Sequence, residues 1–250
     1  MSTPPLFLLD ELPDGELAEL SGPEGHHAAT VRRIRVGETV QLGDGRGAIA
    51  TGSVVSVGRD TLGVRIVWRE QVPRPRPFVT LAQALVKGDR GELAVELATE
   101  AGVDAVLPWR AARCVARWED GPRGAKALAR WRSTALAAAK QSRRAWLPVV
   151  GEPVGTRELV TRCSALGAPT GLALVLHESA DTPLANTLAA VPEATELLLV
   201  VGPEGGVSDE ELDVLTASGA HPVRLGPEVL RASTAAAVAL GAIGALTTRW

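Results

Sequence analysis

The chain has 250 residues, 46% of them hydrophobic, with a mean hydropathy of +0.11 and a formal net charge of -3. These values indicate an ordinary soluble globular protein, long enough for one large domain or for a typical domain with a smaller companion. They exclude a membrane-spanning chain, because the longest apolar run, residues 232–246, is shorter than the roughly 20 residues that a bilayer requires.

The cysteines and the N-terminus bear on the compartment. Cys114 and Cys163 form neither a disulfide framework nor a metal-ligand spacing. Residues 1–11 lack the basic segment of a secretory signal. We therefore expect a cytoplasmic protein without disulfides.

Short strand patterns separated by turns fill residues 36–68. Val64, Ile66 and Trp68 alternate with other residues, and glycine-containing turns occur at the spacing of a small barrel. The sequence predicts an all-β module with strands at residues 38–42, 48–57 and 62–68.

A short helix is expected just before this module, over residues 26–35, HHAATVRRIR. It would carry three arginines, Arg32, Arg33 and Arg35. The adjacent histidines His26 and His27 cannot share one helical face, and no carboxylate partner is evident, so we expect no metal site there.

Residues 71–77, QVPRPRP, contain three prolines and predict an extended, semi-rigid linker. We place the domain boundary in this linker. Residues 1–72 would form the first domain and residues 73–250 the second.

Beyond the linker, strands alternate with helices, which predicts an α/β domain with a mainly parallel sheet. Leu93, Leu97 and Ala101 form one stripe of the first helix, and residues 151–169 show no regular pattern. A second, longer helix would turn Leu128, Trp131, Ala135 and Ala138 inward. We expect strands at residues 78–86, 103–108, 114–118 and 172–176, and helices at residues 90–101 and 124–146.

Charge is distributed unevenly along the chain. Residues 109–144 carry 10 basic and 2 acidic side chains, a net charge of +8 within an acidic protein. A polyanion-binding face requires such a concentration, because each neutralised phosphate releases counterions. High-GC codon usage explains the excess of Arg over Lys but not the clustering. A solvated helix surface is the alternative interpretation.

The most informative stretch is residues 197–212, LLLVVGPEGGVSDEEL. A continuous apolar run of strand length breaks at a glycine turn, and Ser208 then precedes Glu211 by the capping-box spacing, so a helix is expected from about Asp209. In α/β sheets, ligands bind at the carboxyl ends of strands. A plain strand-to-helix connection is the alternative, and the glycine spacing matches neither a dinucleotide fingerprint nor a P-loop.

The same arrangement is repeated downstream. Residues 223–225 end at a second Gly-Pro pair, and an Ala-rich helix is expected over residues 230–246. The strand at residues 172–176 ends at His177 and Glu178, which gives a third strand end. Two glycine turns and this strand end predict one composite pocket.

At these residues the sequence resembles the RsmE-type 16S rRNA uridine-N3 methyltransferases of the SPOUT superfamily. The resemblance rests on VVGPEGGVSDEEL followed by RLGPEVLRASTAA, and it extends to VRRIRVGETVQLGDGRG and to ALVKGDRGELAVELATEAGVDAVLPWRAARCV. It implies a PUA-like RNA-binding β-barrel, a SPOUT-type α/β domain with a trefoil knot, bound S-adenosylmethionine, a 16S rRNA or small-subunit partner, and a homodimer.

The resemblance also implies a cofactor pocket and some departures from the family pattern. The chain has Glu228 where the family often has Arg, and Ser233 where it often has Glu, which puts local substrate contacts in doubt. The pocket residues carried over are His177, Glu178, Val201, Gly202, Pro203, Glu204, Gly205, Gly206, Leu225, Gly226, Pro227, Val229, Leu230, Ser233 and Thr234.

Methyl transfer to uridine N3 requires removal of the N3 proton. We hypothesise that Arg231 places positive charge beside the uracil carbonyls and that Glu204 or Glu178 accepts the proton. An alternative makes Arg231 a phosphate contact and Glu204 a turn residue. The candidate RNA contacts are Arg32, Arg33, Arg35, Lys87, Arg90, Arg113, Lys140, Arg143 and Arg144. Two other functions stay open: a non-catalytic RNA-binding or ribosome-assembly protein, and a SPOUT methyltransferase acting on another nucleotide.

Overall fold

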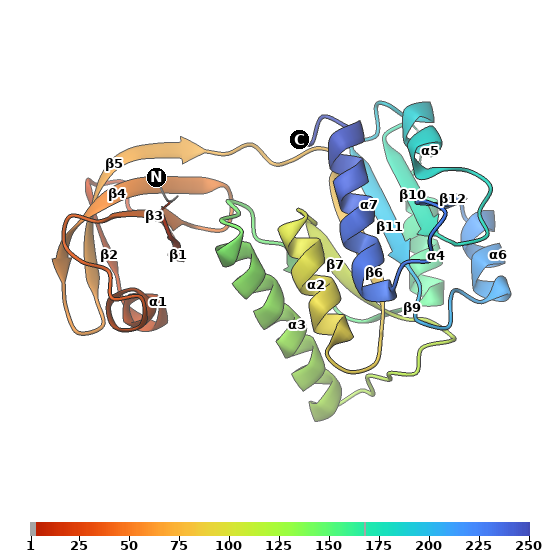
Figure 1. Ribbon diagram of the computed structural model, residues 1–250, viewed down its shortest axis with the longest axis horizontal. Coiled ribbons are helices and arrows are strands. Elements are labelled where there is room, and N and C mark those ends of the chain that lie inside the picture. Colours follow the sequence, from red (N-terminus) through yellow and green to blue (C-terminus); the bar gives the residue numbers. More distant parts are fainter. Residues whose placement is uncertain (1–3, 168) are drawn as a thin grey trace. The chain divides into compact units, whose positions relative to one another are not determined.

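The structure is a computed structural model that describes residues 4–167 and 169–250. By its internal contacts the chain divides into two units, residues 1–74 with 139–147 and residues 75–138 with 148–250 (Figure 1). The segment 139–147, which the sequence assigned to the second domain, therefore belongs by its contacts to the first unit. Two hydrogen bonds hold it there, from Leu147 N to Gly45 O at 3.0 Å and from Trp146 Nε1 to Val72 O at 3.0 Å.

The first unit is built on a five-stranded sheet in the order β1-β3-β4-β5-β2. All neighbouring pairs are antiparallel except β1 with β3. The three strands predicted from the sequence are confirmed, whereas β1 and β2 are too short to give a periodic pattern. The strands are β1 (Leu6–Leu8), β2 (Leu17–Leu20), β3 (Thr39–Gly43), β4 (Ala48–Val57) and β5 (Leu62–Gln71).

The predicted helix over residues 26–35 is wrong in its bounds. Helix α1 spans Gly22–His26 and continues as a π-helical turn over His27–Val31. The helix begins earlier because Pro23 stands in its first turn, and it ends earlier because Arg33 has a φ of 55°. The three arginines thus follow the helix. His26 also has a carboxylate partner, since its Nδ1 lies 2.7 Å from Asp60 Oδ1, and this hydrogen bond lowers the pKa of the Asp60 carboxyl.

The second unit is built on a parallel sheet of seven strands, as the alternation of strands and helices predicted. The order is β12-β10-β11-β6-β7-β8, and β9 also pairs with β7. Every pairing in it is parallel. The strands are β6 (Phe78–Ala84), β7 (Ala105–Arg110), β8 (Val149–Val150), β9 (Val154–Gly155), β10 (Gly171–Leu176), β11 (Glu196–Val201) and β12 (Ala220–Val223).

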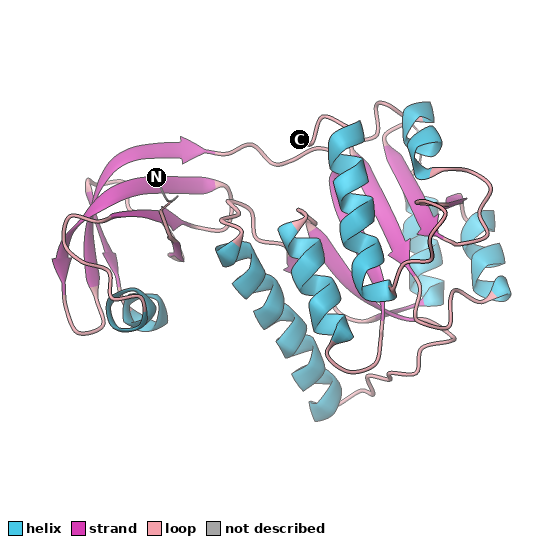
Figure 2. Cartoon of the chain, in the orientation of Figure 1, coloured by secondary structure: helices cyan, strands magenta, loops and turns pink. Residues whose placement is uncertain are grey.

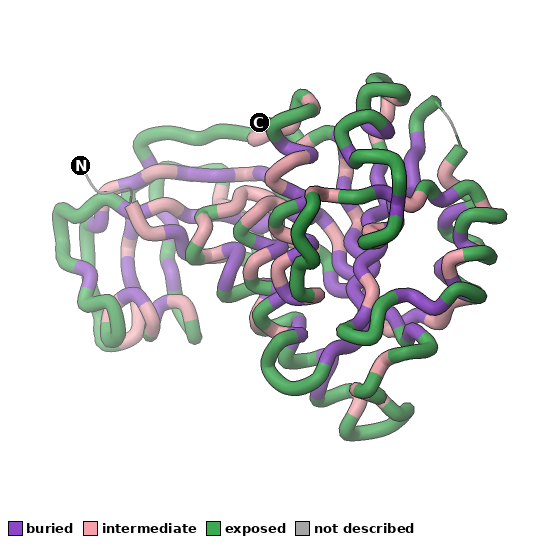
Figure 3. The backbone as a smooth tube through the Cα atoms, turned by 45° about the vertical axis from the view of Figure 1, so that its right-hand side comes forward, coloured by how far each residue is buried: buried purple, intermediate pink, exposed green. Residues whose placement is uncertain are grey.

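Helices cover both faces of this sheet, because its central strands are apolar on both sides. In β11, Leu197, Leu199 and Val201 join one core cluster, and Leu198 and Val200 join the other. Figure 3 shows the buried residues as purple stretches of the chain in the interior. The first cluster lies under α2 (Arg90–Glu100), α3 (Pro122–Gln141), α5 (Leu184–Ala190) and α7 (Ala232–Leu246), and the second lies under α4 (Thr156–Ala165) and α6 (Asp209–Ala217) (Figure 2).

Four sequence predictions in this unit are corrected. Residues 114–118 form no strand, and α3 ends at Gln141 rather than at residue 146, followed by Arg143 with a φ of 56°. The interval 151–169 contains α4, which begins where the Glu158 carboxylate accepts the Gly155 N–H at 2.8 Å. The apolar face predicted for α2 is also wrong. The residues that α2 buries are Gly91, Ala94, Val95, Ala98 and Thr99, while Leu93 is 41% exposed.

The C-terminal tail is attached by a buried ion pair. Arg249 Nη1 lies 2.8 Å from Asp104 Oδ2, and both side chains are 3% exposed. The same carboxylate oxygen accepts the Val79 N–H at 2.8 Å, and the Arg249 guanidinium also donates to the carbonyls of Pro77 and Gly102. The pair therefore connects the tail, three residues beyond the end of α7, to β6 and to the residue that precedes β7. None of the described helices is long and apolar enough to cross a membrane.

Replacing Arg249 by Ala should lower the free energy of unfolding by about 3–5 kcal/mol, because the buried Asp104 carboxylate would lose the cation of this ion pair. Urea denaturation followed by circular dichroism measures this. Arg157→Ala, at an exposed position of α4, is the matched control and should change the free energy by less than about 0.5 kcal/mol. A loss for Arg249→Ala no larger than that of the control would contradict the assignment.

Candidate functional site

The carboxyl ends of four strands lie level with one another. Leu176 at the end of β10 pairs with Val201 of β11 and with Val223 of β12, and Val201 pairs with Gln83 of β6. Because these strands are parallel and in register, the loops that follow them leave the sheet at the same edge. The loops enclose a cavity of about 670 Å³.

The cavity brings together most of the residues that the sequence selected. Both proposed catalytic residues, Arg231 and Glu204, line it. Of the proposed cofactor residues only Pro227 and Thr234 do not. Those that line it are His177, Glu178, Val201, Gly202, Pro203, Glu204, Gly205, Gly206, Leu225, Gly226, Val229, Leu230 and Ser233.

The glycine turn after β11 has a conformation that few other residues adopt. Gly206 N–H donates to Pro203 O at 2.9 Å, which closes the turn, and Gly206 has a φ of 73°. A Cβ at Gly202 would lie 2.9 Å from Val207 Cγ2. The turn therefore depends on glycine at both positions, and its backbone borders the cavity.

Two contacts from distant segments hold this turn. Glu204 Oε1 accepts the Lys87 N–H at 3.2 Å, which joins the turn to the loop between β6 and α2. Arg113 Nη1 donates to Gly205 O and to Val207 O, both at 3.3 Å. Arg113, selected as an RNA contact, thus lines the cavity and supports its wall.

A buried carboxylate fixes the start of α6. The predicted capping box is confirmed, because Glu211 N–H donates to Ser208 Oγ at 3.2 Å and Ser208 N–H donates to Glu211 Oε2 at 3.4 Å. Glu211 Oε1 also accepts from Ala112 N–H at 2.9 Å and from Thr156 Oγ1 at 2.7 Å. These two partners could not be found from the sequence, because the capping pattern reveals only the local half of the interaction.

The opposite wall is formed where β10 and β12 end. His177 N–H donates to Val223 O at 3.0 Å, and Arg224 exchanges backbone hydrogen bonds with Thr182 and Leu184, both 2.9 Å long. His177 Nδ1 accepts the Ser179 N–H at 3.3 Å, so its ring closes a turn. Thr234 Oγ1 donates to Arg231 O at 3.2 Å, so its hydroxyl is used at the start of α7.

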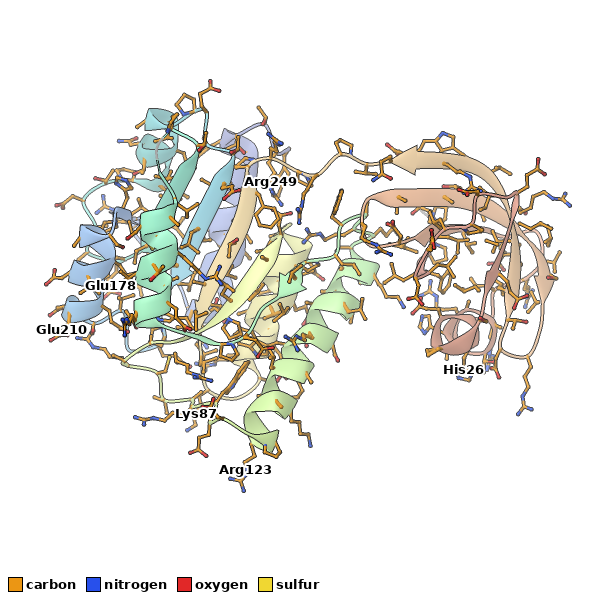
Figure 4. The ribbon with its side chains drawn as sticks, turned by 180° about the vertical axis from the view of Figure 1, so that it is seen from behind. His26, Lys87, Arg123, Glu178, Glu210 and Arg249 are labelled. Carbon is orange, nitrogen blue, oxygen red and sulfur yellow. The ribbon has the colours of Figure 1, made fainter. Side chains whose placement is uncertain are left out.

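The cavity is balanced in charge. Four carboxylates, Glu178, Glu204, Asp209 and Glu228, and four guanidinium groups, Arg90, Arg113, Arg224 and Arg231, border it. All eight of these charged residues are exposed, and Ser233 is buried. Glu178, one of these carboxylates, is labelled in Figure 4. Such a wall suits a ligand that carries charges of both signs.

The remaining candidate RNA contacts lie in both units. Arg90, the first residue of α2, borders the cavity, and Lys87 is exposed in the loop before that helix. In the first unit, Arg143 is exposed and Arg144 half-buried, as is Lys140, and Arg32, Arg33 and Arg35 are exposed. Lys140 forms an ion pair with Glu24 in which the two side chains are 20% and 24% exposed.

Neither Cys114 nor Cys163 borders the cavity. Both are free thiols, and burial raises the pKa of Cys114 and of Cys163. Among the described residues, no group of three or more His, Cys, Asp or Glu side chains has the arrangement of a metal site. The polar groups that border this cavity are carboxylates, guanidinium groups, backbone amides, the His177 imidazole and the hydroxyls of Ser179 and Ser233.

Known proteins resemble this chain over nearly its whole length. The sequence matches the family described as RNA methyltransferase PUA domain over residues 20–67 and the family described as RNA methyltransferase domain over residues 73–244. Ribosomal RNA small subunit methyltransferase E of Mycobacterium bovis is 55% identical over 246 residues, which cover 98% of this chain and 93% of the relative.

Two solved structures have the same architecture. Ribosomal RNA small subunit methyltransferase E from Neisseria gonorrhoeae, bound to S-adenosyl methionine, superimposes with a TM-score of 0.84 at 28% identity and covers 98% of both chains. A methyltransferase from Legionella pneumophila in complex with the cofactor SAM superimposes with a TM-score of 0.83 at 31% identity and covers 98% of this chain and 99% of that one.

Replacing Gly206 by Ala should destabilise the protein by about 1–2 kcal/mol, because the left-handed backbone conformation is unfavourable for a residue with a Cβ. Thermal and urea unfolding measure this. Gly167→Ala is the matched control, since a Cβ there meets nothing within 4 Å and the position has no positive φ. Equal effects of the two substitutions would show that the turn relaxes without strain.

Proposed function

The chain belongs to the family of ribosomal RNA small subunit methyltransferase E proteins, and on that basis we propose that it transfers a methyl group from S-adenosylmethionine to N3 of one uridine in 16S rRNA. The observation that carries this proposal is the cavity at the coincident ends of β10, β11 and β12. A non-catalytic RNA-binding protein has no need of such a cavity.

The cavity fits the cofactor in size and chemistry. Its volume of about 670 Å³ lies within the range of about 300–1,000 Å³ that small-molecule sites occupy. Leu225, Val229 and Leu230 supply apolar surface for an adenine ring, and the glycine turn supplies backbone groups that can bind its edge. The exposed carboxylates of Glu178 and Glu228 are suited to the positive groups of the cofactor. We propose that the pocket residues named above hold it.

The main task of the protein is positioning. When bound, S-adenosylmethionine supplies a methyl group carried on a sulfonium, and the uridine nitrogen must lie in line with it, about 3 Å away and without intervening water. The glycine turn, held by Glu204 and Arg113, and the 224–231 segment, bonded to the loop after β10, form rigid walls for this purpose.

Arg231 is placed to favour the deprotonated base. It is exposed at the rim of the cavity, at the N-cap of α7. A guanidinium beside the uracil carbonyls stabilises the negative charge that develops when N3 loses its proton. Glu204, with Oε1 bonded to the Lys87 amide, and Glu178 are the proton acceptors we propose.

Several finer features belong to the same proposal. Residues 1–72 would form the RNA-binding domain and residues 73–250 the methyltransferase domain, working as a homodimer in the cytoplasm. The helices α2 and α7 pack together and expose the apolar side chains Leu93 and Val238, which support a partner surface for the homodimer.

A trefoil knot is supported by the path of the chain. The chain leaves the edge strand β12, runs beside residues 182–184 and then packs as α7 against β11 and β6.

Methylation with labelled cofactor tests the function directly. The protein should label 16S rRNA, either naked or in purified small subunits, at a single uridine. A methyl group on N3 blocks Watson–Crick pairing, so primer extension should stop one nucleotide before it. Label in another nucleotide, or none, would refute the assignment. Absence of cofactor binding in calorimetry would favour the RNA-binding protein instead.

Arg231→Ala should reduce kcat by about 10²- to 10³-fold, the size of effect found when a donor to a developing negative charge is removed. The dissociation constant of the cofactor should stay within about twofold, because the role assigned to Arg231 is toward the uracil. Arg231→Lys keeps the positive charge and should recover part of the rate. A full rate for Arg231→Ala would remove this residue from the mechanism.

A further inference from the structure

We propose that a second cavity, next to the first, binds a nucleotide that flanks the target uridine in the RNA. This cavity has a volume of about 540 Å³ and is bordered by the loop before α2, by residues 116–119 and by the first turns of α3. The inference rests on the proposed function only in taking RNA as the substrate. No residue proposed above as catalytic or cofactor-binding borders this cavity.

Two arginines of this cavity have no acidic partner among the described residues. Arg117 and Arg123 are exposed and border it, and no carboxylate lies within 4.0 Å of either guanidinium. Most of the neighbouring arginines are neutralised, since Arg110 pairs with Asp120, Arg130 with Glu92 and Arg132 with Glu152. Figure 4 labels Arg123 and Lys87, which lie at the same end of the unit. Cations left unpaired in this way are available to phosphate.

The cavity also offers an aromatic surface. Trp118 borders it and is half-buried. Its ring is held edge-to-face against the buried Trp131, with centroids 4.9 Å apart and an interplanar angle of 77°. A ring fixed by a buried neighbour is preorganised for stacking with a base. Proteins bind single-stranded nucleic acid with this combination of cations along the backbone and aromatic rings against the bases.

Carboxylates in the same wall suit a base rather than a bare phosphate. Asp89 and Glu119 are exposed and border the cavity together with the arginines. A carboxylate repels a phosphate but accepts hydrogen bonds from the amino and imino groups of a base edge. The mixture of two unpaired cations, an indole and two acceptors therefore matches a whole nucleotide.

The position of the cavity explains why the nucleotide would flank the target. Val86 borders both cavities, so the end of the loop between β6 and α2, residues 86–89, lies between them. Its Lys87 amide is bonded to Glu204 in the glycine turn, which keeps this partition in place. A target base that leaves its stack exposes its neighbours, and a second site one loop away can hold one of them.

Equilibrium binding of 16S rRNA to the full-length protein tests the proposal. The Arg117→Ala/Arg123→Ala variant should bind about tenfold more weakly than the wild type. The slope of log Kd against log salt concentration should fall by about 1.4, since each phosphate contact to a single strand contributes about 0.7. The matched control is Arg157→Ala/Arg162→Ala, two exposed arginines of α4 on the other face of the sheet, which should change neither quantity.

The readouts separate the possible failures. Cofactor affinity, measured by calorimetry without RNA, should be the same in the wild type and in both variants, which shows that the first cavity is intact. An RNA affinity and salt slope identical to those of the α4 variant would overturn the proposal, as would a loss of the same size in both variants. The binding assay includes no methyl transfer. Failure to methylate 16S rRNA would therefore refute the proposed function, and the binding data would still test whether the second cavity binds RNA.

Discussion

The register of the parallel sheet is the constraint on which the site depends. Leu176, Val201 and Val223 are level with one another because β10 pairs residue for residue with both β11 and β12. A shift of one residue in either pairing would turn the buried side chains of that strand toward the wrong helical layer. Since Leu199 belongs to one core cluster and Val200 to the other, burial on both faces holds the register and thereby brings the loops together.

The sequence revealed those parts of the site that are encoded locally. The apolar run of β11, the glycine turn and the capping box of Ser208 and Glu211 depend on residues within a few positions of one another, and all three are confirmed. The contacts of Glu211 with Ala112 and Thr156 span 99 and 55 residues. No local pattern encodes such contacts, because they depend on how the elements pack.

The errors have equally specific causes. Leu93 was placed on the main stripe of α2 because it is large and apolar, but the buried face of α2 carries small residues such as Gly91, Ala94 and Ala98, and a Cβ at Gly91 would lie 3.0 Å from the Trp131 ring of α3. Size did not predict burial there, since close approach of two helices favours small side chains. The end of α3 was misplaced because a left-handed Arg143 has no sequence signature comparable to that of glycine.

The loop between the two cavities determines how contacts made in the second cavity affect catalysis in the first. The partition is held to the glycine turn by a hydrogen bond from the Lys87 amide to the Glu204 carboxylate, and a hydrogen bond to a charged group contributes about 1.5–3 kcal/mol. If the partition stays fixed, contacts in the second cavity bind the ground state and the transition state equally, and they lower KM alone. If RNA binding shifts it, Arg90 and Glu204, which border the first cavity, move with it, and the same contacts then raise kcat. Leu85 and Val86 are 1% and 6% exposed, and Leu85 N–H donates to Trp109 O at 3.0 Å, so the start of the loop is held by more than this one bond, which favours the first behaviour.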